Sequence, residues 1–235
     1  MGAAVAGQLR VPVVWASDGR SEETRARAEK FEDVVTPDAL AARSDVILSI
    51  CPPHGAHEVA GSVAGFDGIY VEANAVAPAT AREVLELFPR GVDGGIVGGP
   101  SAPRLYLSGP DAPAVAELFA GSKVEPRVVS DELGVASAVK VTFAAWTKGT
   151  AAMLLDILEL ARAEGVEEEL LAEWRESLPE LVSRVGSAQR SADAKGWRWV
   201  GEMMEIADAF DAHGLPDGFH RAAAEVFGWP QGVRS

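Results

Sequence analysis

Lys140 is the residue whose type and surroundings best suit proton chemistry. It lies in the segment SAVKVTF, with apolar residues on both sides, and is one of only five lysines among 21 basic residues. Burial disfavours the ammonium form, so a lysine in such a setting can pass a proton to or from a hydroxyl or carbonyl group. Lys148 and Lys195 are second candidates for this role. The ordinary alternative for a lone lysine is a solvated or snorkelling side chain.

A second polar group lies in the segment ASDGRSEETRA, directly after an apolar run. In dinucleotide-binding folds this position contacts the adenosine ribose. An acid there accepts from the 2′-hydroxyl of NAD, whereas an arginine pairs with the 2′-phosphate of NADP. Arg20, with Ser17 and Ser21 beside it, favours NADP, and Asp18 favours NAD. We predict NADP, with NAD as the alternative; a simple loop and helix cap would give the same pattern.

Two further apolar runs end in residues that suit ligand contacts. The segment SICPPHGAHEV places Cys51, Pro52 and Pro53 just beyond a strand, and VEANAVAP places Asn74 at the next strand end. Ligands of open α/β sheets bind at the carboxyl edge of the strands. We therefore predict that these four residues contact the cofactor, with the Asn74 amide suited to a carboxamide or hydroxyl group.

The segment VDGGIVGGPSAP contains a flexible loop with Gly98 and Gly99, where the backbone can come close to a ligand. A metal site is a weaker possibility. His54 and His57 are three residues apart, but no cysteine or acid with ligand spacing accompanies them. We predict a substrate contact at the glycines and no metal.

The elements that must position these residues alternate along the first half of the chain. Apolar runs nearly continuous in Val, Ile and Leu are typical of parallel strands covered on both faces. Thr36 with Pro37, and Pro78, indicate helix starts. The alternation predicts an α/β fold with a Rossmann-like, mostly parallel sheet. The predicted strands are residues 11–16, 45–50, 68–73, 92–97, 104–108 and 123–129; the predicted helices are 21–31, 36–44, 53–64, 78–88 and 111–121.

The second half of the chain has no strand-like run. Residues 132–166 are typical of one long apolar helix, and Gly214 with Pro216 indicates a helix stop and restart. We therefore predict two domains: a Rossmann-like nucleotide-binding domain over residues 1–130 and a helical domain over residues 131–235.

Composition limits the function further. The net charge of −14 argues against a nucleic-acid surface. A single cysteine allows no intramolecular disulfide and favours a reducing compartment. No stretch approaches the roughly 18 apolar residues of a membrane helix, and no signal peptide is visible. We expect a cytoplasmic protein without a membrane partner.

The order of these pieces resembles the β-hydroxyacid dehydrogenases, the 6-phosphogluconate dehydrogenase-like family that includes 3-hydroxyisobutyrate dehydrogenase and imine reductases. MGAAVAGQL is similar to the end of the family's nucleotide turn, and DVILSICPP to its next cofactor-contacting strand end. VEANAVAP is similar to D-x-S-T-x-x-P, VDGGIVGG to the D-A-P-V-S-G-G substrate loop, and ELGVASAVK to the G-x-G-x-x-x-K helix. AKGWRWVGEMMEIA is similar to the later K-D segment, and the helical half resembles a less-characterised branch.

The resemblance implies that Lys140 is the catalytic lysine, that Lys195 lies at the cofactor or substrate, and that the helical half forms a homodimer. Together with the residues above, the predicted cofactor contacts are Gly2, Ser17, Arg20, Ser21, Cys51, Pro52, Pro53, Asn74 and Lys195, and the predicted substrate contacts are Gly98, Gly99, Asn74 and Lys140.

The chain also departs from the family pattern. Val97 stands where a substrate-binding serine is usual, Phe143 and Ala144 where asparagine is usual, and Gly196 replaces the aspartate of K-D. These changes indicate a more apolar pocket. The family's first strand and first two turn glycines are absent, so the sequence looks as if it starts inside the nucleotide turn.

The resemblance thus implies hydride transfer between NADP(H) and a small hydroxyacid or imine-like substrate. The alternative is a non-catalytic or truncated nucleotide-binding or interaction protein, which the departures favour. Decarboxylation of 6-phosphogluconate is disfavoured because no cationic cluster for a sugar phosphate is visible.

Overall fold

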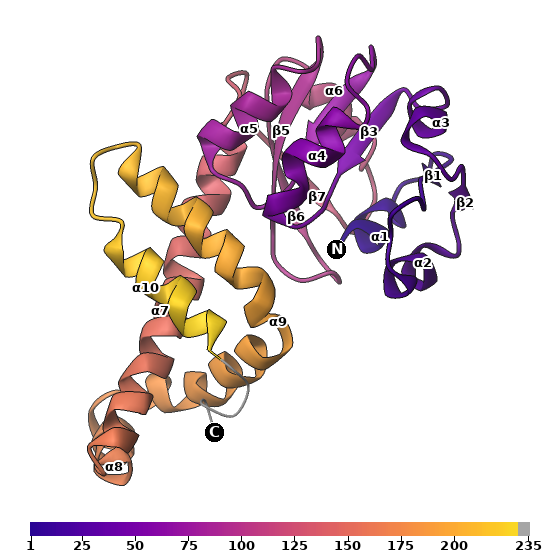
Figure 1. Ribbon diagram of the computed structural model, residues 1–235. Coiled ribbons are helices and arrows are strands. Elements are labelled where there is room, and N and C mark those ends of the chain that lie inside the picture. The colour runs from indigo at the N-terminus through magenta and orange to yellow at the C-terminus, as the bar shows by residue number, and fades with distance from the viewer. Residues whose placement is uncertain (230–235) are drawn as a thin grey trace. The chain divides into compact units, whose positions relative to one another are not determined.

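The computed structural model describes residues 1–229 and divides the chain after Lys140 into two compact units. Figure 1 shows a sheet-containing unit followed by a helical one. The division falls later than the predicted boundary at residue 130. The reason lies in the first turns of the long helix α7 (Val135–Ala163), where Ala136 and Ser137 are buried in the first unit.

A five-stranded sheet forms the centre of the first unit. Its strands lie in the order β3 (Val46–Ser49), β4 (Ile69–Glu72), β5 (Gly91–Val97), β6 (Arg104–Ser108) and β7 (Glu125–Ser130). β3, β4 and β5 are parallel, β6 runs antiparallel to β5, and β7 is parallel to β6. The carboxyl ends of the first three strands and the amino ends of the last two therefore meet at one edge. This parallel-rich sheet confirms the predicted fold class.

A separate parallel pair of two-residue strands, β1 (Val14–Trp15) and β2 (Glu32–Asp33), lies outside this sheet. β1 is shorter than predicted, because Pro12 has no N–H to extend a ladder. β2 was not predicted, because two exposed acidic residues carry no strand signal. β1 and β3 share no ladder.

The helices of the first unit begin where the sequence indicates. The Thr36 hydroxyl accepts from the backbone N–H of Ala39 with Pro37 in the first turn, and Pro78 is the first residue of its helix. These helices are α1 (Gly2–Ala6), α2 (Glu22–Ala28), α3 (Pro37–Ala41), the short 3-10 helix η1 (Pro53–Gly55), α4 (Ala56–Gly61), α5 (Pro78–Leu85) and α6 (Ala112–Glu117).

Alternation of side chains gives the five-stranded sheet two covered faces. On one face, Val71 and Val92 pack in a cluster with Val5 of α1 and with residues of α6. On the other, Ile47 and Tyr70 pack with α4 and α5. Burial on both faces explains why the early strands are nearly continuous in apolar residues.

The second unit is helical, as predicted. It contains α7 from Val141 onward and three further helices, with Gly214 at a φ of +66° where the last loop begins. Its core includes Leu158, Met203 and Phe227. None of the helices described between residues 1 and 229 has the length and apolar character needed to span a membrane. The further helices are α8 (Glu167–Ser177), α9 (Pro179–Asp211) and α10 (Gly218–Gly228).

Candidate functional site

Two adjacent glycines bring α7 against β5 and place Lys140 there. A Cβ on Gly95 would lie 2.6 Å from the carbonyl oxygen of Ala136 and 3.0 Å from Cβ of Lys140. A Cβ on Gly94 would lie 3.0 Å from Cβ of Ala73, on the opposite face. Only residues without side chains permit this approach on both sides of the strand. Lys140 is partly exposed and belongs to the first unit.

A buried carboxylate fixes the start of α7 beside these glycines. Asp93, fully buried, accepts from the Ser137 backbone N–H at 2.9 Å, from the Ser137 hydroxyl at 2.5 Å and from the Ser108 hydroxyl at 3.0 Å. The Ser108 hydroxyl in turn accepts from the backbone N–H of Ala136 at 3.0 Å. The first N–H groups of a helix lack partners within it and favour negative charge, so this network anchors α7 to β5 and β6. Sequence reasoning missed it, although an acid inside a buried strand was the available signal.

The predicted substrate loop follows directly at the carboxyl end of β5. Gly98 has a φ of +98°, a conformation that side chains rarely adopt, and nothing lies within 4 Å of where a Cβ on Gly99 would be. Both residues are exposed. The loop thus offers open backbone a few residues beyond the contact of Lys140 with Gly95.

Asn74 holds the neighbouring strand ends together. It is buried; its side-chain oxygen accepts from the Cys51 backbone N–H, and its amide donates to the Ser49 hydroxyl at 3.1 Å. Its own backbone N–H donates to the Glu72 carboxylate at 3.0 Å. The side-chain oxygen and nitrogen of Asn74 thus both have protein partners, and the residue fixes the Cys51 turn. Burial raises the pKa of the Cys51 thiol to about 11, with the Glu72 charge adding to it.

The loop after β1 is shaped by residues that already have partners. The Ser17 hydroxyl holds the pKa of the Asp33 carboxyl below its usual range, and Ser21 caps α2 by accepting from Thr24. Arg25 donates to the carbonyl oxygens of Ser17 at 2.8 Å and Arg20 at 3.2 Å. Sequence reasoning missed Arg25, whose role depends on the fold of the loop.

Arg20 differs from its neighbours in this loop. Its side chain is exposed and forms no hydrogen bond or ion pair within residues 1–229. Its positive charge works to lower the pKa of the Cys51 thiol, against the larger opposite effect of burial. The loops after β1 and β3 therefore lie near each other. A Cβ on Gly2, at the start of α1, would lie 3.7 Å from Cβ of Ile50, the residue before Cys51.

The region where the loops after β1 and β3 approach the start of α1 fits the phosphates of a dinucleotide. Gly2, Arg20 and the Cys51 turn converge there, and Arg20 is an unpaired cation in a chain with a net charge of −14. Pro52 and the buried Pro53 lead from the turn into η1. The structure therefore gathers the predicted cofactor residues of the first unit at one edge, with Asn74 and Ser17 acting as supports.

The remaining candidates are two lysines of the helical unit and the histidine pair of the first unit. Lys148 forms an ion pair with Glu202 inside the helical unit, and both side chains are largely buried. Lys195 is exposed on α9 in that unit, and its contact with the cofactor stays a prediction. His57 lies 3.9 Å from Glu83 on the surface, and no group of three metal-ligating side chains forms among residues 1–229.

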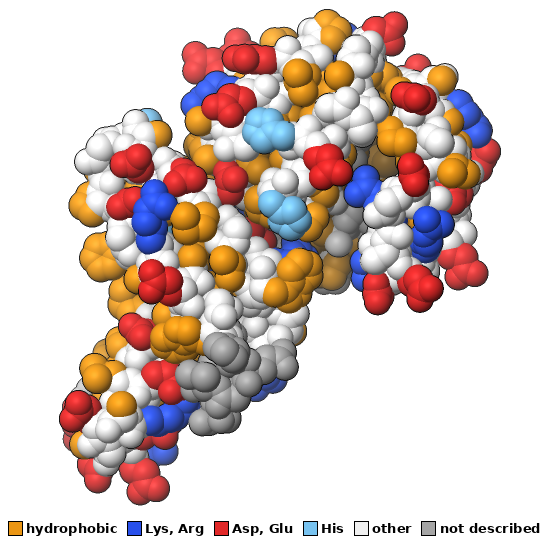
Figure 2. Space-filling model, viewed as in Figure 1, with side chains coloured by type: hydrophobic (Ala, Val, Ile, Leu, Met, Phe, Trp, Pro, Cys, Tyr) orange, Lys and Arg blue, Asp and Glu red, His pale blue; other side chains and the backbone are white. Residues whose placement is uncertain are grey.

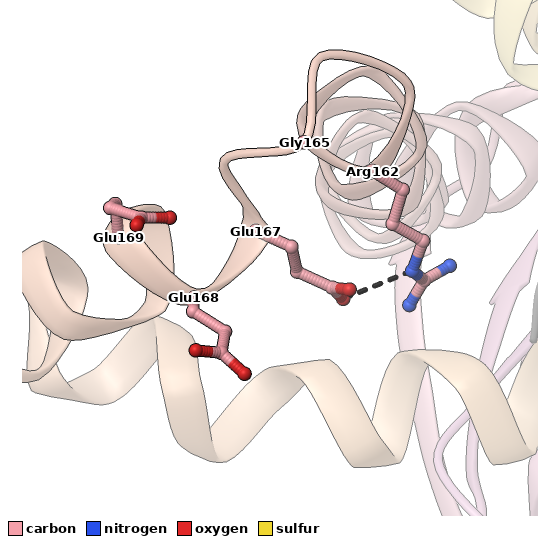
Figure 3. Close-up of a pocket in the computed structure, with 5 residues that line it drawn as sticks. All are labelled: Arg162, Gly165, Glu167, Glu168 and Glu169. Atoms are coloured by element: carbon pink, nitrogen blue, oxygen red, sulfur yellow. Dashed lines mark hydrogen bonds and ion pairs between the residues drawn. The ribbon is translucent and has the colours of Figure 1, made fainter.

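A hollow at the turn between α7 and α8 has a different character. Figure 3 shows its lining of Arg162, Gly165 and three successive glutamates, with Arg162 paired to Glu167 at 3.0 Å. The glutamates occupy the first turn of α8, where the helix dipole favours negative charge. Their placement is explained by the helix and indicates no ligand.

Comparisons with known proteins bear on the fold of both units. A domain of unknown function, DUF1932, matches residues 161–229. An uncharacterised 28.5 kDa protein of Methanothermus fervidus is 30% identical over 168 residues, which are 69% of this chain and 66% of that protein, just under two thirds of its length. A conserved protein of unknown function, described as structurally similar to 3-hydroxyacid dehydrogenases, is 27% identical with a TM-score of 0.68, covering 96% of this chain and 90% of that one. The chain is a structural relative of the 3-hydroxyacid dehydrogenases. The predicted resemblance is therefore confirmed.

Solved structures of lower sequence identity share the fold. 3-Hydroxyisobutyrate dehydrogenase of Mycobacterium tuberculosis is 14% identical with a TM-score of 0.67, covering 97% of this chain and 89% of that one. A reductive aminase of Aspergillus terreus is 18% identical with a TM-score of 0.57, covering 96% and 89%, and was solved with NADPH4 or NADPH. The chain thus shares with these two oxidoreductases the fold of a Rossmann-type unit followed by a helical C-terminal domain.

Proposed function

We propose that this chain is an NADP-dependent oxidoreductase acting on a small hydroxyacid or imine-like substrate. The observation that carries the proposal is the placement of Lys140 against β5, with the open Gly98–Gly99 backbone at the end of the same strand. NADP(H) would supply or accept the hydride. Because hydride transfer at carbon requires a matching proton at oxygen or nitrogen, Lys140 would hold and release that proton.

Arg20 supports the choice of NADP over NAD. A guanidinium without a protein partner, beside the Cys51 turn, suits the extra phosphate of NADP, which a bidentate arginine recognises. The exposed Asp18 nearby favours NAD, because its carboxylate can accept from the ribose 2′-hydroxyl. The two residues therefore favour different cofactors, and the affinities for NADPH and NADH distinguish between them.

The experiment is a titration of the chain with NADPH and NADH, followed by energy transfer from tryptophan to the nicotinamide. Trp15 in β1 is two residues before Ser17 and serves as the donor of the first unit. We expect Arg20→Gln to weaken NADPH binding about tenfold or more and to leave NADH unchanged, because one charge-assisted contact is lost. Arg43→Gln, which removes an exposed arginine paired with Glu32, is the matched control.

Turnover tests the role of Lys140. On a substrate found by screening hydroxyacids and imines, Lys140→Met should abolish proton transfer while the affinity for NADPH is retained. Full turnover by this variant would contradict the proposed role. A folded chain that binds neither cofactor would instead support the non-catalytic alternative.

We also propose that the chain forms a homodimer through α7. Its exposed apolar residues lie three, seven, four and three residues apart, spacings that place them along one side of the helix: Phe143, Trp146, Met153, Ile157 and Leu160. Among the exposed residues between Phe143 and Leu160, only Asp156 is charged. Figure 2 shows acidic side chains spread over the visible surface. A second copy of the chain offers an equivalent apolar stripe on its own α7. The acidic parts of its surface would not complement an apolar stripe.

A further inference from the structure

Arg104 lies at the same sheet edge as the substrate loop. It is the first residue of β6, whose amino end meets the carboxyl end of β5, and it pairs in register with Val97. The side chains of such a cross-strand pair project to one face of the sheet. Gly95, two residues before Val97, meets Ala136 and Lys140 on that face. Arg104 and Lys140 therefore belong to one face of one unit.

The guanidinium of Arg104 has no hydrogen bond or ion pair among the residues that the structure describes, 1–229. Glu125 of β7 is its neighbour in register, but that carboxylate accepts from Arg127 at 2.7 and 2.9 Å. Arg43 and Arg90 of this unit, by contrast, each pair with an acidic side chain. A partly buried cation without an anion is unfavourable in isolation and becomes favourable when an anionic ligand binds.

The side chain of Arg104 extends to the exposed loop that contains Gly98 and Gly99. Its Nη2 atom lies 4.0 Å from the position that a Cβ on Gly98 would occupy. Gly95 and Gly98 are about 10 Å apart along an extended strand, at roughly 3.3 Å per residue. A molecule of a few carbons that lies along this edge, past the apolar side chain of Val97, can therefore contact Arg104 at one end and Lys140 at the other.

We propose that Arg104 determines substrate specificity by binding a carboxylate at the end of the substrate remote from Lys140. The inference rests on the proposed function and narrows it. An acid substrate engages the guanidinium through two parallel hydrogen bonds, whereas an uncharged ketone or imine leaves it without an anion. Val97 stands where the family pattern has a serine and offers no polar group to a substrate. Its cross-strand neighbour Arg104 supplies a guanidinium at the same place.

The test compares two probes of nearly equal shape by isothermal titration calorimetry on the full chain, with and without NADP+. The probes are 3-hydroxypropionate and its uncharged amide, 3-hydroxypropionamide. We expect the wild type to prefer the acid, and Arg104→Gln to lose about ten- to hundredfold in affinity for the acid only. Arg104→Lys keeps the charge but loses the two parallel donors of the guanidinium. Its affinity for the acid should fall between those of the wild type and Arg104→Gln. Arg43→Gln removes an equal charge before the amino end of β3 and should change nothing.

Several results would overturn the proposal. Equal binding of the two probes, no detectable binding of the acid, or an unchanged affinity in Arg104→Gln would each do so. Tighter binding of inorganic phosphate than of the acid would show that phosphate is the group recognised. Weaker NADPH binding in Arg104→Gln, with the acid unaffected, would assign Arg104 to the cofactor. Because acid binding is also measured without NADP+, failure of the cofactor proposal can be distinguished from failure of this one. Arg104→Gln should keep the wild-type melting temperature, since Arg104 loses no protein partner.

Discussion

Replacing Gly95 by alanine tests the close approach that positions Lys140. The added Cβ would lie 2.6 Å from the backbone oxygen of Ala136 and 3.0 Å from Cβ of Lys140, so β5 and the first turns of α7 must separate. Inserting one methyl group into a packed core costs about 1–3 kcal/mol. For a unit of this size that corresponds to a fall in melting temperature of roughly 3–12 °C. The φ of Gly95 lies outside the left-handed region, so backbone strain does not contribute.

Gly99→Ala is the matched control, because nothing lies within 4 Å of its added methyl group and its φ is also permissive. Calorimetry follows both units, and hydrogen exchange of peptides spanning residues 91–97 and 135–140 locates the change. The expected result is faster exchange at both segments in Gly95→Ala and wild-type behaviour in Gly99→Ala. If the two variants melted within about 1 °C of each other, the packing of α7 on β5 would not depend on the missing side chain.

Two further predictions concern the helical unit. Burial lowers the pKa of His220 in the folded chain, so as the pH falls the unfolded chain takes up the proton first. The free energy of unfolding therefore decreases as the pH falls below about 6.5 toward the lower pKa of the folded state. Thermal melts between about pH 7.5 and pH 5.5 should show this decline, His220→Gln should flatten it, and the exposed His213→Gln should not. Met153→Glu, which places a charge in the exposed stripe of α7, should convert a dimer to a monomer in analytical ultracentrifugation, whereas Ser187→Glu on an exposed position of α9 should not. A monomeric wild type, or a dimeric Met153→Glu, would contradict the pairing.

Strands with a strong local signal could be predicted from the sequence, and those without one could not. β6 falls on the predicted residues 104–108, and β3 and β4 lie within their predicted runs, because buried strands need uninterrupted apolar residues. The antiparallel turn between β5 and β6 was not predicted, since the short loop after Gly99 carries no signal for direction that periodicity could detect. β2 is held by its partner β1 alone.

The residues that support the site were harder to predict than those that face it. Lys140 and Gly98 stand out by composition and by resemblance, since an isolated lysine and a pair of glycines are visible in one dimension. Asp93 binds groups from residues 108 and 137, and such a network exists only once the sheet and α7 are assembled. The amide of Asn74 illustrates the same limit: its residue type suits a ligand, but the fold has already engaged it with Ser49 and Cys51.

The anchoring of α7 has a consequence for chemistry. Because Asp93 ties the helix start to β5 and β6, the positions of Lys140 on the helix and Arg104 on β6 are set by one hydrogen-bonded core. The distance between the proposed proton donor and the proposed anion receptor is then fixed before any ligand binds, and preorganisation of this kind lowers the entropic cost of orienting a small substrate. A chain that kept Lys140 but loosened the Asp93 network should therefore lose selectivity between an acid and its amide before it lost affinity for the cofactor, whose candidate contacts lie at the ends of β1 and β3.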